Sequence, residues 1–238
     1  MTHPSHATEK AQLIVALDYP SAEPALALAG QLSGHVRWLK VGLELYLAAG
    51  NSIVRELRDQ GFSVFLDLKL HDIPNTVAGA VRSASTAGAS MLTIHSLGGP
   101  VMMTAAAEAA AASPEPLQLL AVSVLTSMDQ AQLEAIGIAT SPAEQVQRLA
   151  RLATASGISG LVASPQEVAL LRREFPALTF VIPGIRPAGA SIGDQKRIAT
   201  PAQAARDGAN FLVVGRPITQ APDPAAATQA ILAELAGA

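Results

Sequence analysis

Residues 62–95 read FSVFLDLKLHDIPNTVAGAVRSASTAGASMLTIH, and this stretch contains the pattern that decides the fold. It begins with a run of apolar and β-branched residues at 62–69, continues with an alanine-rich segment of helical period at 75–87, and ends with a second apolar run at 90–95. A short strand, a helix and another short strand in this order are typical of parallel strands joined by a crossover helix. Residues 62–95 therefore predict one β-α-β unit.

The same alternation extends in both directions along the chain. We expect eight strands, at 13–18, 37–42, 62–69, 90–95, 118–126, 160–164, 179–183 and 211–215. Helices are expected between and after them, at 22–33, 44–60, 75–87, 100–112, 143–156, 165–174, 201–208 and 224–236. Four glycines precede strands at positions where helices commonly end in a left-handed residue, namely Gly61, Gly88, Gly157 and Gly208.

The 238 residues divide into eight repeats of about 30, the size of a strand and a helix with short loops. The pattern predicts an α/β chain with a single (β/α)₈ barrel domain over residues 1–238, in which residues 1–10 form a polar N-terminal tail. A doubly wound open sheet is the structural alternative.

Composition excludes several classes of function. The chain has 16 Lys and Arg against 19 Asp and Glu, a formal net charge of −3, so neither a nucleic acid nor an anionic membrane is expected as a partner. It has no cysteine, which excludes disulfides, thiolate metal sites and thiol nucleophiles. No apolar run suits a spanning helix or a signal-peptide core, and we expect a cytoplasmic protein.

Polar residues stand at the carboxyl ends of most predicted strands. In a (β/α)₈ barrel these ends meet at one mouth, where catalytic residues collect. Each residue alone could be structural, but their joint placement favours a site. The residues in question are Asp18, Lys40, Asp67 with Lys69, His95, Thr126 with Ser127, Arg186, and Gly215 with Arg216.

The third strand carries the strongest functional signal. Side chains alternate along a strand, so Asp67 and Lys69 share one face with Phe65, whereas the intervening leucines face the helices. Charges inside a barrel mouth are costly unless they are paired, and Lys40 and Asp72 are the expected further cation and anion. The alternatives are that Asp67 and Lys69 form a purely structural ion pair and that Asp72 is a helix N-cap ahead of Pro74.

This arrangement also suggests a chemistry. A lysine flanked by carboxylates is held protonated, so it suits a general acid better than a Schiff-base nucleophile. The loops after strands seven and eight of such barrels commonly bind phosphate, and here they hold Arg186 and the Gly215-Arg216 pair. The five histidines do not suggest a metal cluster, although Mg²⁺ held by carboxylates stays an alternative.

The stretch at 67–76, DLKLHDIPNT, resembles the catalytic signature of the orotidine 5′-phosphate decarboxylase family. Further matching pieces occur in the family's order over residues 11–233. They are LD at 17–18, LKVG at 39–42, TIH at 93–95, VLTS at 124–127, PGIRP at 183–187, GDQ at 193–195 and VGRPIT at 214–219.

The resemblance implies decarboxylation of orotidine 5′-monophosphate to UMP, the last step of de novo pyrimidine synthesis, without a cofactor or metal. It assigns catalysis to Lys69, Asp67, Lys40 and Asp72, with Lys69 protonating the carbanion at C6. It also implies ribose contacts from Asp18, Lys40 and Thr76, pyrimidine contacts from Thr126 and Ser127, and phosphate contacts from Arg186, Gln195, Gly215 and Arg216. Finally, it implies a homodimer in which Asp72 and Thr76 enter the neighbouring chain's site.

Two other functions stay open. A sugar-phosphate decarboxylase or hexulose-phosphate synthase of the same superfamily shares an Asp-x-Lys-x-x-Asp pattern but is similar to metal-dependent enzymes. A non-catalytic barrel would bind UMP without releasing CO₂. The Ile-Pro-Asn-Thr continuation at 73–76 favours the nucleotide decarboxylase.

Overall fold

The structure is a computed structural model that describes residues 10–187 and 198–237, and its strands form one closed barrel. All neighbouring strands are parallel, and β1 pairs with β8 as well as β2, so the sheet has no open edge. This closure confirms the barrel and excludes the open sheet. In chain order the strands are β1 Gln12–Leu17, β2 Trp38–Gly42, β3 Ser63–Leu70, β4 Met91–His95, β5 Gln118–Val122, β6 Gly160–Val162, β7 Thr179–Ile182 and β8 Phe211–Val214.

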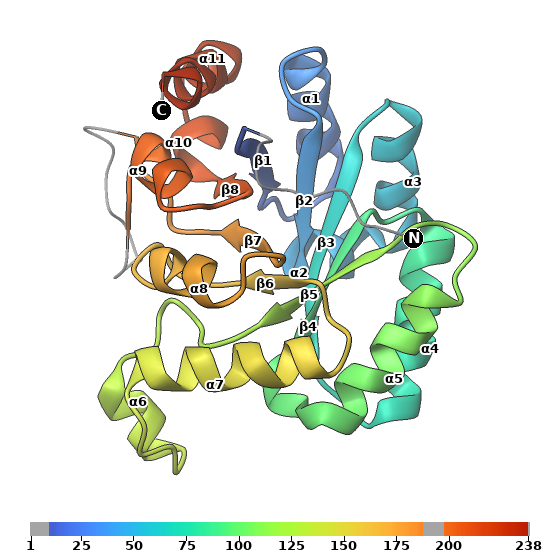
Figure 1. Ribbon diagram of the computed structural model, residues 1–238. Helices are drawn as coiled ribbons and strands as arrows, with labels where there is room; N and C mark the ends of the chain where they lie inside the picture. Colours follow the sequence, from blue (N-terminus) through green and yellow to red (C-terminus); the bar gives the residue numbers. More distant parts are fainter. Residues whose placement is uncertain (1–9, 188–197, 238) are drawn as a thin grey trace.

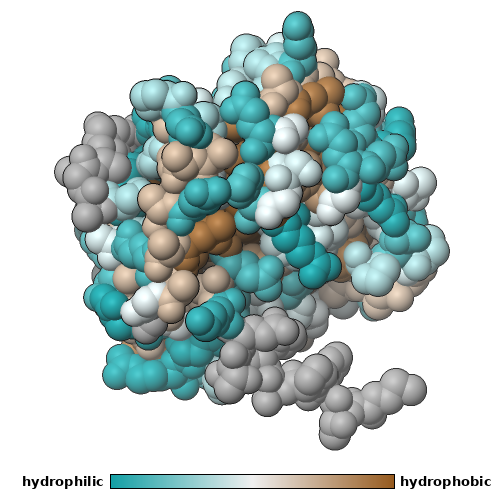
Figure 2. Space-filling model, turned by 90° about the horizontal axis from the view of Figure 1, so that it is seen from above, coloured by the Kyte–Doolittle hydropathy of each residue, from teal (hydrophilic) through white to brown (hydrophobic). Residues whose placement is uncertain are grey.

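Helices surround the strands on the outside of the barrel, and α4 lies beside α5 (Figure 1). Hydrophilic residues cover most of the face seen in Figure 2, with hydrophobic residues visible mainly in the recesses between them. None of the described helices is long and apolar enough to cross a membrane. The helices are α1 Ala22–Leu32, α2 Leu43–Ala49, α3 Asn51–Asp59, α4 Pro74–Ala87, the 3₁₀ turn η1 Ser96–Gly98, α5 Gly99–Ala111, α6 Gln130–Ala135, α7 Pro142–Ala155, α8 Val168–Glu174, α9 Pro201–Arg206, α10 Arg216–Thr219 and α11 Pro224–Ala236.

Three local predictions were wrong. The single helix expected at 44–60 is divided into α2 and α3 at Gly50, whose φ of 62° lies outside the helical range. The fifth strand ends at Val122 instead of residue 126, because its pairing with both neighbours ends there, at His95 of β4 and Val162 of β6. The short helices α6 and α10 lie within segments that were expected to be loops.

The alternation of side chains along the strands produces two apolar layers. One set fills the interior of the barrel and includes Phe65 of β3, Met91 of β4 and Val181 of β7. The other set lies between the barrel and the helices and is buried by them. The four glycines predicted before strands all have positive φ, as expected.

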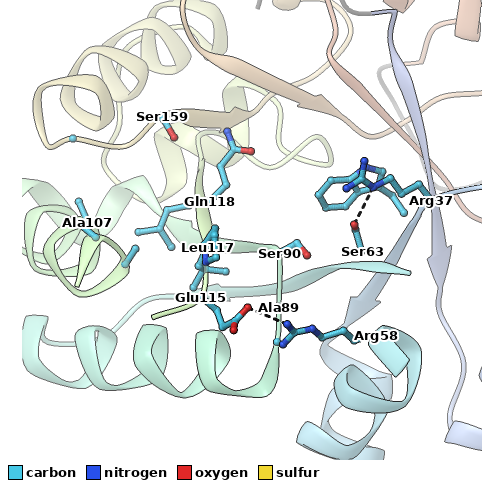
Figure 3. Close-up of a pocket in the computed structure, with 17 residues that line it drawn as sticks. Arg37, Arg58, Ser63, Ala89, Ser90, Ala107, Glu115, Leu117, Gln118 and Ser159 are labelled. Carbon is cyan, nitrogen blue, oxygen red and sulfur yellow. Dashed lines mark hydrogen bonds and ion pairs between the residues drawn. The ribbon is translucent and has the colours of Figure 1, made fainter. Parts of the chain in front are cut away.

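A hollow of about 870 Å³ lies beside the amino ends of β2 to β6 and is lined by polar and apolar residues, including Arg58 of α3 and Ala107 of α5 (Figure 3). Arg58 and Glu115 point toward one another there, with their Nη2 and Oε2 atoms 2.9 Å apart. Trp38 lies at the same end and donates a hydrogen bond from its indole nitrogen to Gln12 Oε1. The residues predicted to act chemically lie at the opposite end, the mouth.

Candidate active site

A bulge in β3 shapes the centre of the mouth. Leu66 pairs with Leu92 of β4, but the next pair is Leu70 with Ile94, so three residues of β3 lie opposite one residue of β4. Within the bulge Lys69 has a φ of 49°, the single positive value of a non-glycine residue in the described part of the chain. Its side chain turns back onto Asp67, and the Lys69 Nζ atom lies 2.9 and 3.0 Å from the two carboxylate oxygens.

Two further charges extend this pair into an alternating array. The Lys40 Nζ atom lies 3.9 Å from Asp67 Oδ2 and 2.9 Å from Asp18 Oδ1. The order Asp18, Lys40, Asp67, Lys69 therefore alternates negative and positive. Lys40 is only 8% exposed and the Asp67 side chain 15%, so this pair is screened less than a surface pair would be, whereas the Asp18 side chain is 61% exposed.

Two hollows adjoin the array and share the side chains of Lys40, Pro183 and Val213. The first has a volume of about 190 Å³, with Asp67 and Lys69 on its wall. Its other walls are mainly apolar, with Phe65, Val122, Val124, Leu125, Val162, Ala163 and Val181, and include Thr126. The second has a volume of about 410 Å³ and is lined by Asp18, Arg186, Gly215 and Arg216, among others. Together they suit an elongated ligand that has one end packed between apolar walls and the Asp67-Lys69 pair, and an anionic group at its other end.

Arg186 is a buried cation on the wall of the second hollow, where the anionic end of a ligand would bind. It is 8% exposed, and its Nη1 atom donates to the Ile185 carbonyl oxygen over 2.8 Å. Burial lowers the pKa of Arg186, and the positive charge of Arg216 lowers it further. The positive charges of the two arginines repel each other. A phosphate bound between them would reduce this repulsion, so the position favours a phosphate.

The structure brings most of the predicted site residues together at the two hollows. They are Asp18, Lys40, Asp67, Lys69, Thr126, Arg186, Gly215 and Arg216. Ser127 and Thr76 are exposed and line neither hollow. Gln195 lies outside the described residues.

Asp72 is also separate from the array of its own chain. It is exposed, and its Oδ1 atom accepts a hydrogen bond from the backbone nitrogen of Ile73 over 2.6 Å. Helix α4 has Ile73 as its N-cap residue, so the alternative that Asp72 is the N-cap is wrong. Among the described residues no ion pair joins Asp72 to Lys69 or Lys40.

Comparison with known proteins places the chain in one family. The family model described as orotidine 5′-phosphate decarboxylase / HUMPS family matches residues 11–231. The chain belongs to this family. The orotidine 5′-phosphate decarboxylase of Halorhodospira halophila is 57% identical over 95% of this chain and 97% of its own length, and that of Opitutus terrae is 55% identical over 94% and 97%. The crystal structure of the Lactobacillus acidophilus orotidine 5′-phosphate decarboxylase superposes with a TM-score of 0.84 at 38% identity, covering 95% of this chain and 99% of that one.

A histidine pair lies beside the charged array of this orotidine 5′-phosphate decarboxylase family member. The rings of His71 and His95 stack with centroids 5.5 Å apart, and His95 Nδ1 accepts a hydrogen bond from the Leu97 backbone nitrogen. Burial, followed by the charges of His71 and Lys69, lowers the pKa of His95. The lowered pKa favours the neutral imidazole of His95, the form in which Nδ1 can accept the hydrogen bond from Leu97.

Thr93 and the apolar wall of the first hollow are not among the site residues predicted from the sequence. Thr93 is fully buried on β4, and its hydroxyl contacts both Asp67 and the backbone of Lys69. The sequence did contain an indication of this position. Side chains alternate along a strand, so Thr93 points to the same side of β4 as the inward-facing Met91 and as His95. The alternation also predicts that the valines of the wall face inward, but from the sequence alone they cannot be distinguished from ordinary core residues.

Proposed function

We propose that this chain converts orotidine 5′-monophosphate to UMP and CO₂. Its relatives in Halorhodospira halophila and Opitutus terrae carry the name of that activity. The observation that supports the proposal most strongly is the Asp67-Lys69 pair, which lies on the wall of a narrow apolar hollow. A reaction that forms a carbanion on a flat ring needs a positioned cation at such a place.

The order of chemical groups along the two hollows matches the order along the substrate. The pyrimidine occupies the hollow of about 190 Å³. Thr126 is an uncharged polar residue on the wall of this hollow, which also holds Asp67 and Lys69. The ribose then lies near Asp18 and Lys40, and the phosphate lies between Arg186 and Arg216, where Gly215 allows close approach of the backbone. Gln195 completes the phosphate contacts in this proposal.

In the proposed reaction the bond between C6 and the substrate carboxylate breaks. Its electron pair stays on C6, CO₂ leaves, and the ammonium group of Lys69 transfers a proton to C6 to give UMP. Before that transfer the positive charge of Lys69 stabilises the developing carbanion, while the ion pair with Asp67 holds Lys69 in place and the Lys40 Nζ atom lies 3.9 Å from Oδ2 of the Asp67 carboxylate. Bulk solvent restores the proton to Lys69 after product release.

We also propose that the active enzyme is a homodimer that shares its sites. Five large hydrophobic side chains that follow β2, β3 and β4 are exposed, and these three strands are neighbours in the barrel. The side chains are Leu43, Leu47, Ile73, Leu97 and Val101, of which Leu47 is 81% exposed. A second copy would cover this surface, and the two-fold symmetry of such a contact would bring Asp72 and Thr76 of one chain to the mouth of the other.

The activity is tested with the purified full chain and orotidine 5′-monophosphate. We expect absorbance of the substrate to fall and UMP to form, at the same rate with and without excess EDTA. Lys69→Ala should lower kcat/KM by far more than tenfold, where tenfold corresponds to a barrier change of about 1.4 kcal/mol, and the variant should still bind UMP. A requirement for Mg²⁺ with turnover of a sugar phosphate would favour the hexulose-phosphate synthase alternative, and tight UMP binding without CO₂ release would favour the non-catalytic barrel.

The location and other partners of the enzyme belong to the same proposal. We place it in the cytoplasm, acting on a free nucleotide and not on a nucleic acid or a membrane. The formal net charge of −3 supports the last two points, because polyanionic partners attract basic surfaces.

A further inference from the structure

We propose that Thr93 is a positioning residue, whose hydroxyl holds both Asp67 and Lys69 in their working geometry. The inference rests on the proposed function and adds a residue to its machinery. Thr93 lies in the middle of β4, is completely buried and lines neither hollow. It therefore acts on the ligand only through its neighbours.

The hydroxyl of Thr93 forms two hydrogen bonds, one as donor and one as acceptor. It donates to Asp67 Oδ1 over 2.9 Å and accepts from the backbone nitrogen of Lys69 over 2.8 Å. One oxygen atom thus connects the carboxylate of one proposed catalytic residue with the backbone of the other. The donor and acceptor roles also fix the direction of the hydroxyl hydrogen.

The bulge in β3 explains why this bridge is needed. Asp67, Leu68 and Lys69 lie opposite Thr93 alone, so the regular hydrogen bonds between β3 and β4 are interrupted there. An unpaired backbone N–H inside a protein is costly, and the Thr93 hydroxyl supplies the acceptor that the ladder lacks for Lys69. The hydroxyl consequently stabilises the left-handed conformation of Lys69, whose φ is 49°.

That conformation is what directs the lysine side chain. It brings the Nζ atom to 2.9 and 3.0 Å from the two oxygens of Asp67, and one of those oxygens is the same Oδ1 that Thr93 contacts. Removing the hydroxyl takes away a hydrogen-bond donor to the Asp67 carboxylate. It also takes away the acceptor of the Lys69 backbone N–H. The pair is then free to relax away from the reacting carbon, whereas substrate contacts elsewhere in the hollows stay intact.

The test compares substitutions at Thr93 in the full-length enzyme. Thr93→Val keeps the shape and removes the hydroxyl, and we expect kcat to fall about tenfold or more while KM changes less than about threefold. Thr93→Ser keeps the hydroxyl and should retain kcat within about threefold of wild type. The matched control is Thr228→Val in α11, an equally buried threonine whose hydroxyl contacts only the Pro224 carbonyl oxygen among the described residues, and its kcat should not change.

A second pair covers the case in which Thr93→Val does not fold. Thr93→Ser and Thr93→Cys have nearly the same shape, but a thiol is a weak hydrogen-bond partner, so Thr93→Cys should lose kcat and Thr93→Ser should not. The inference is wrong if Thr93→Val or Thr93→Cys retains wild-type kcat, if Thr93→Ser loses as much as they do, or if the loss falls on KM.

A structural measurement separates this inference from the proposed function. If the wild-type protein does not decarboxylate the nucleotide, the proposed function fails, but the bridge can still be examined in crystals of the Thr93→Val or Thr93→Cys protein. We expect Lys69 to leave the left-handed region or its Nζ atom to move away from Asp67. An unchanged bulge and ion pair in the variant would refute the positioning role.

Discussion

At Lys69 the chain places a charged, non-glycine residue in the left-handed region, with a φ of 49°. Such a conformation costs about 1–3 kcal/mol and persists only where the surroundings impose it. Here the bifurcated contact with Asp67 and the backbone bond to Thr93 offset that cost. Backbone strain at this residue is therefore part of how the ammonium group is aimed.

Arg216 allows a test of binding at the far end of the site. Arg216→Ala removes one of two cations at the proposed phosphate position, and a charge-assisted hydrogen bond contributes about 1.5–3 kcal/mol. We expect kcat/KM for orotidine 5′-monophosphate to fall about 10- to 150-fold, and the slow reaction of the phosphate-free nucleoside to change less than about twofold. Steady-state kinetics with both substrates measure this, and equal losses for the two would instead assign Arg216 a structural role.

At the scale of the elements, two glycines that end helices before strands have the same backbone conformation but differ in the space around them. Gly61 after α3 and Gly88 after α4 have φ of 90° and 92°. A Cβ at Gly61 would meet no atom within 4 Å, whereas one at Gly88 would lie 2.7 Å from Arg58 Cδ. The pair therefore separates backbone strain from a steric clash.

Gly61→Ala should lower the free energy of unfolding by about 1–2 kcal/mol through strain alone. Gly88→Ala should cost at most about 1 kcal/mol more, because Arg58 can move and loses only its exposed ion pair with Glu115. Urea unfolding of each variant, with Arg58→Ala added to Gly88→Ala as the control, measures both costs. A neutral Gly61→Ala would contradict the strain argument, and an excess that survives removal of Arg58 would contradict the clash argument.

At the scale of the whole molecule, the exposed position of Asp72 leads to a prediction about mixed dimers. Lys69→Ala and Asp72→Ala proteins should each be nearly inactive, but in a mixed dimer one shared site carries both defects and the other carries neither. With random pairing, half of the dimers are mixed and about a quarter of all sites recover wild-type chemistry. Activity measured after refolding the two variants together checks this.

The matched control mixes Lys69→Ala with Lys40→Ala, because both residues belong to the same chain's array. Those mixed dimers have one defect in every site, so no activity should return. If dimers confirmed as mixed between Lys69→Ala and Asp72→Ala stay as inactive as their parents, Asp72 serves its own chain and the shared-site proposal fails.

The amino-acid sequence by itself determined the eight β-α repeats, the helix-ending glycines and the convergence of Asp18, Lys40, Asp67, Lys69 and the two arginines on one mouth. These follow from local rules: a period of two along strands, a period of 3.6 along helices, and the common direction of parallel strands.

Only the tertiary structure decided how far the fifth strand extends and that β3 bulges at Lys69. It also decided between two expectations for Asp72, the strand argument that put it in its own chain's array and the family resemblance that put it outside, in favour of the second. It also showed that the buried Thr93 hydroxyl bridges the two proposed catalytic residues. The physical reason is that register and hydrogen-bond partners depend on a neighbouring strand far along the chain. A threonine on β4 looks like any other buried β-branched residue until β3 is placed beside it.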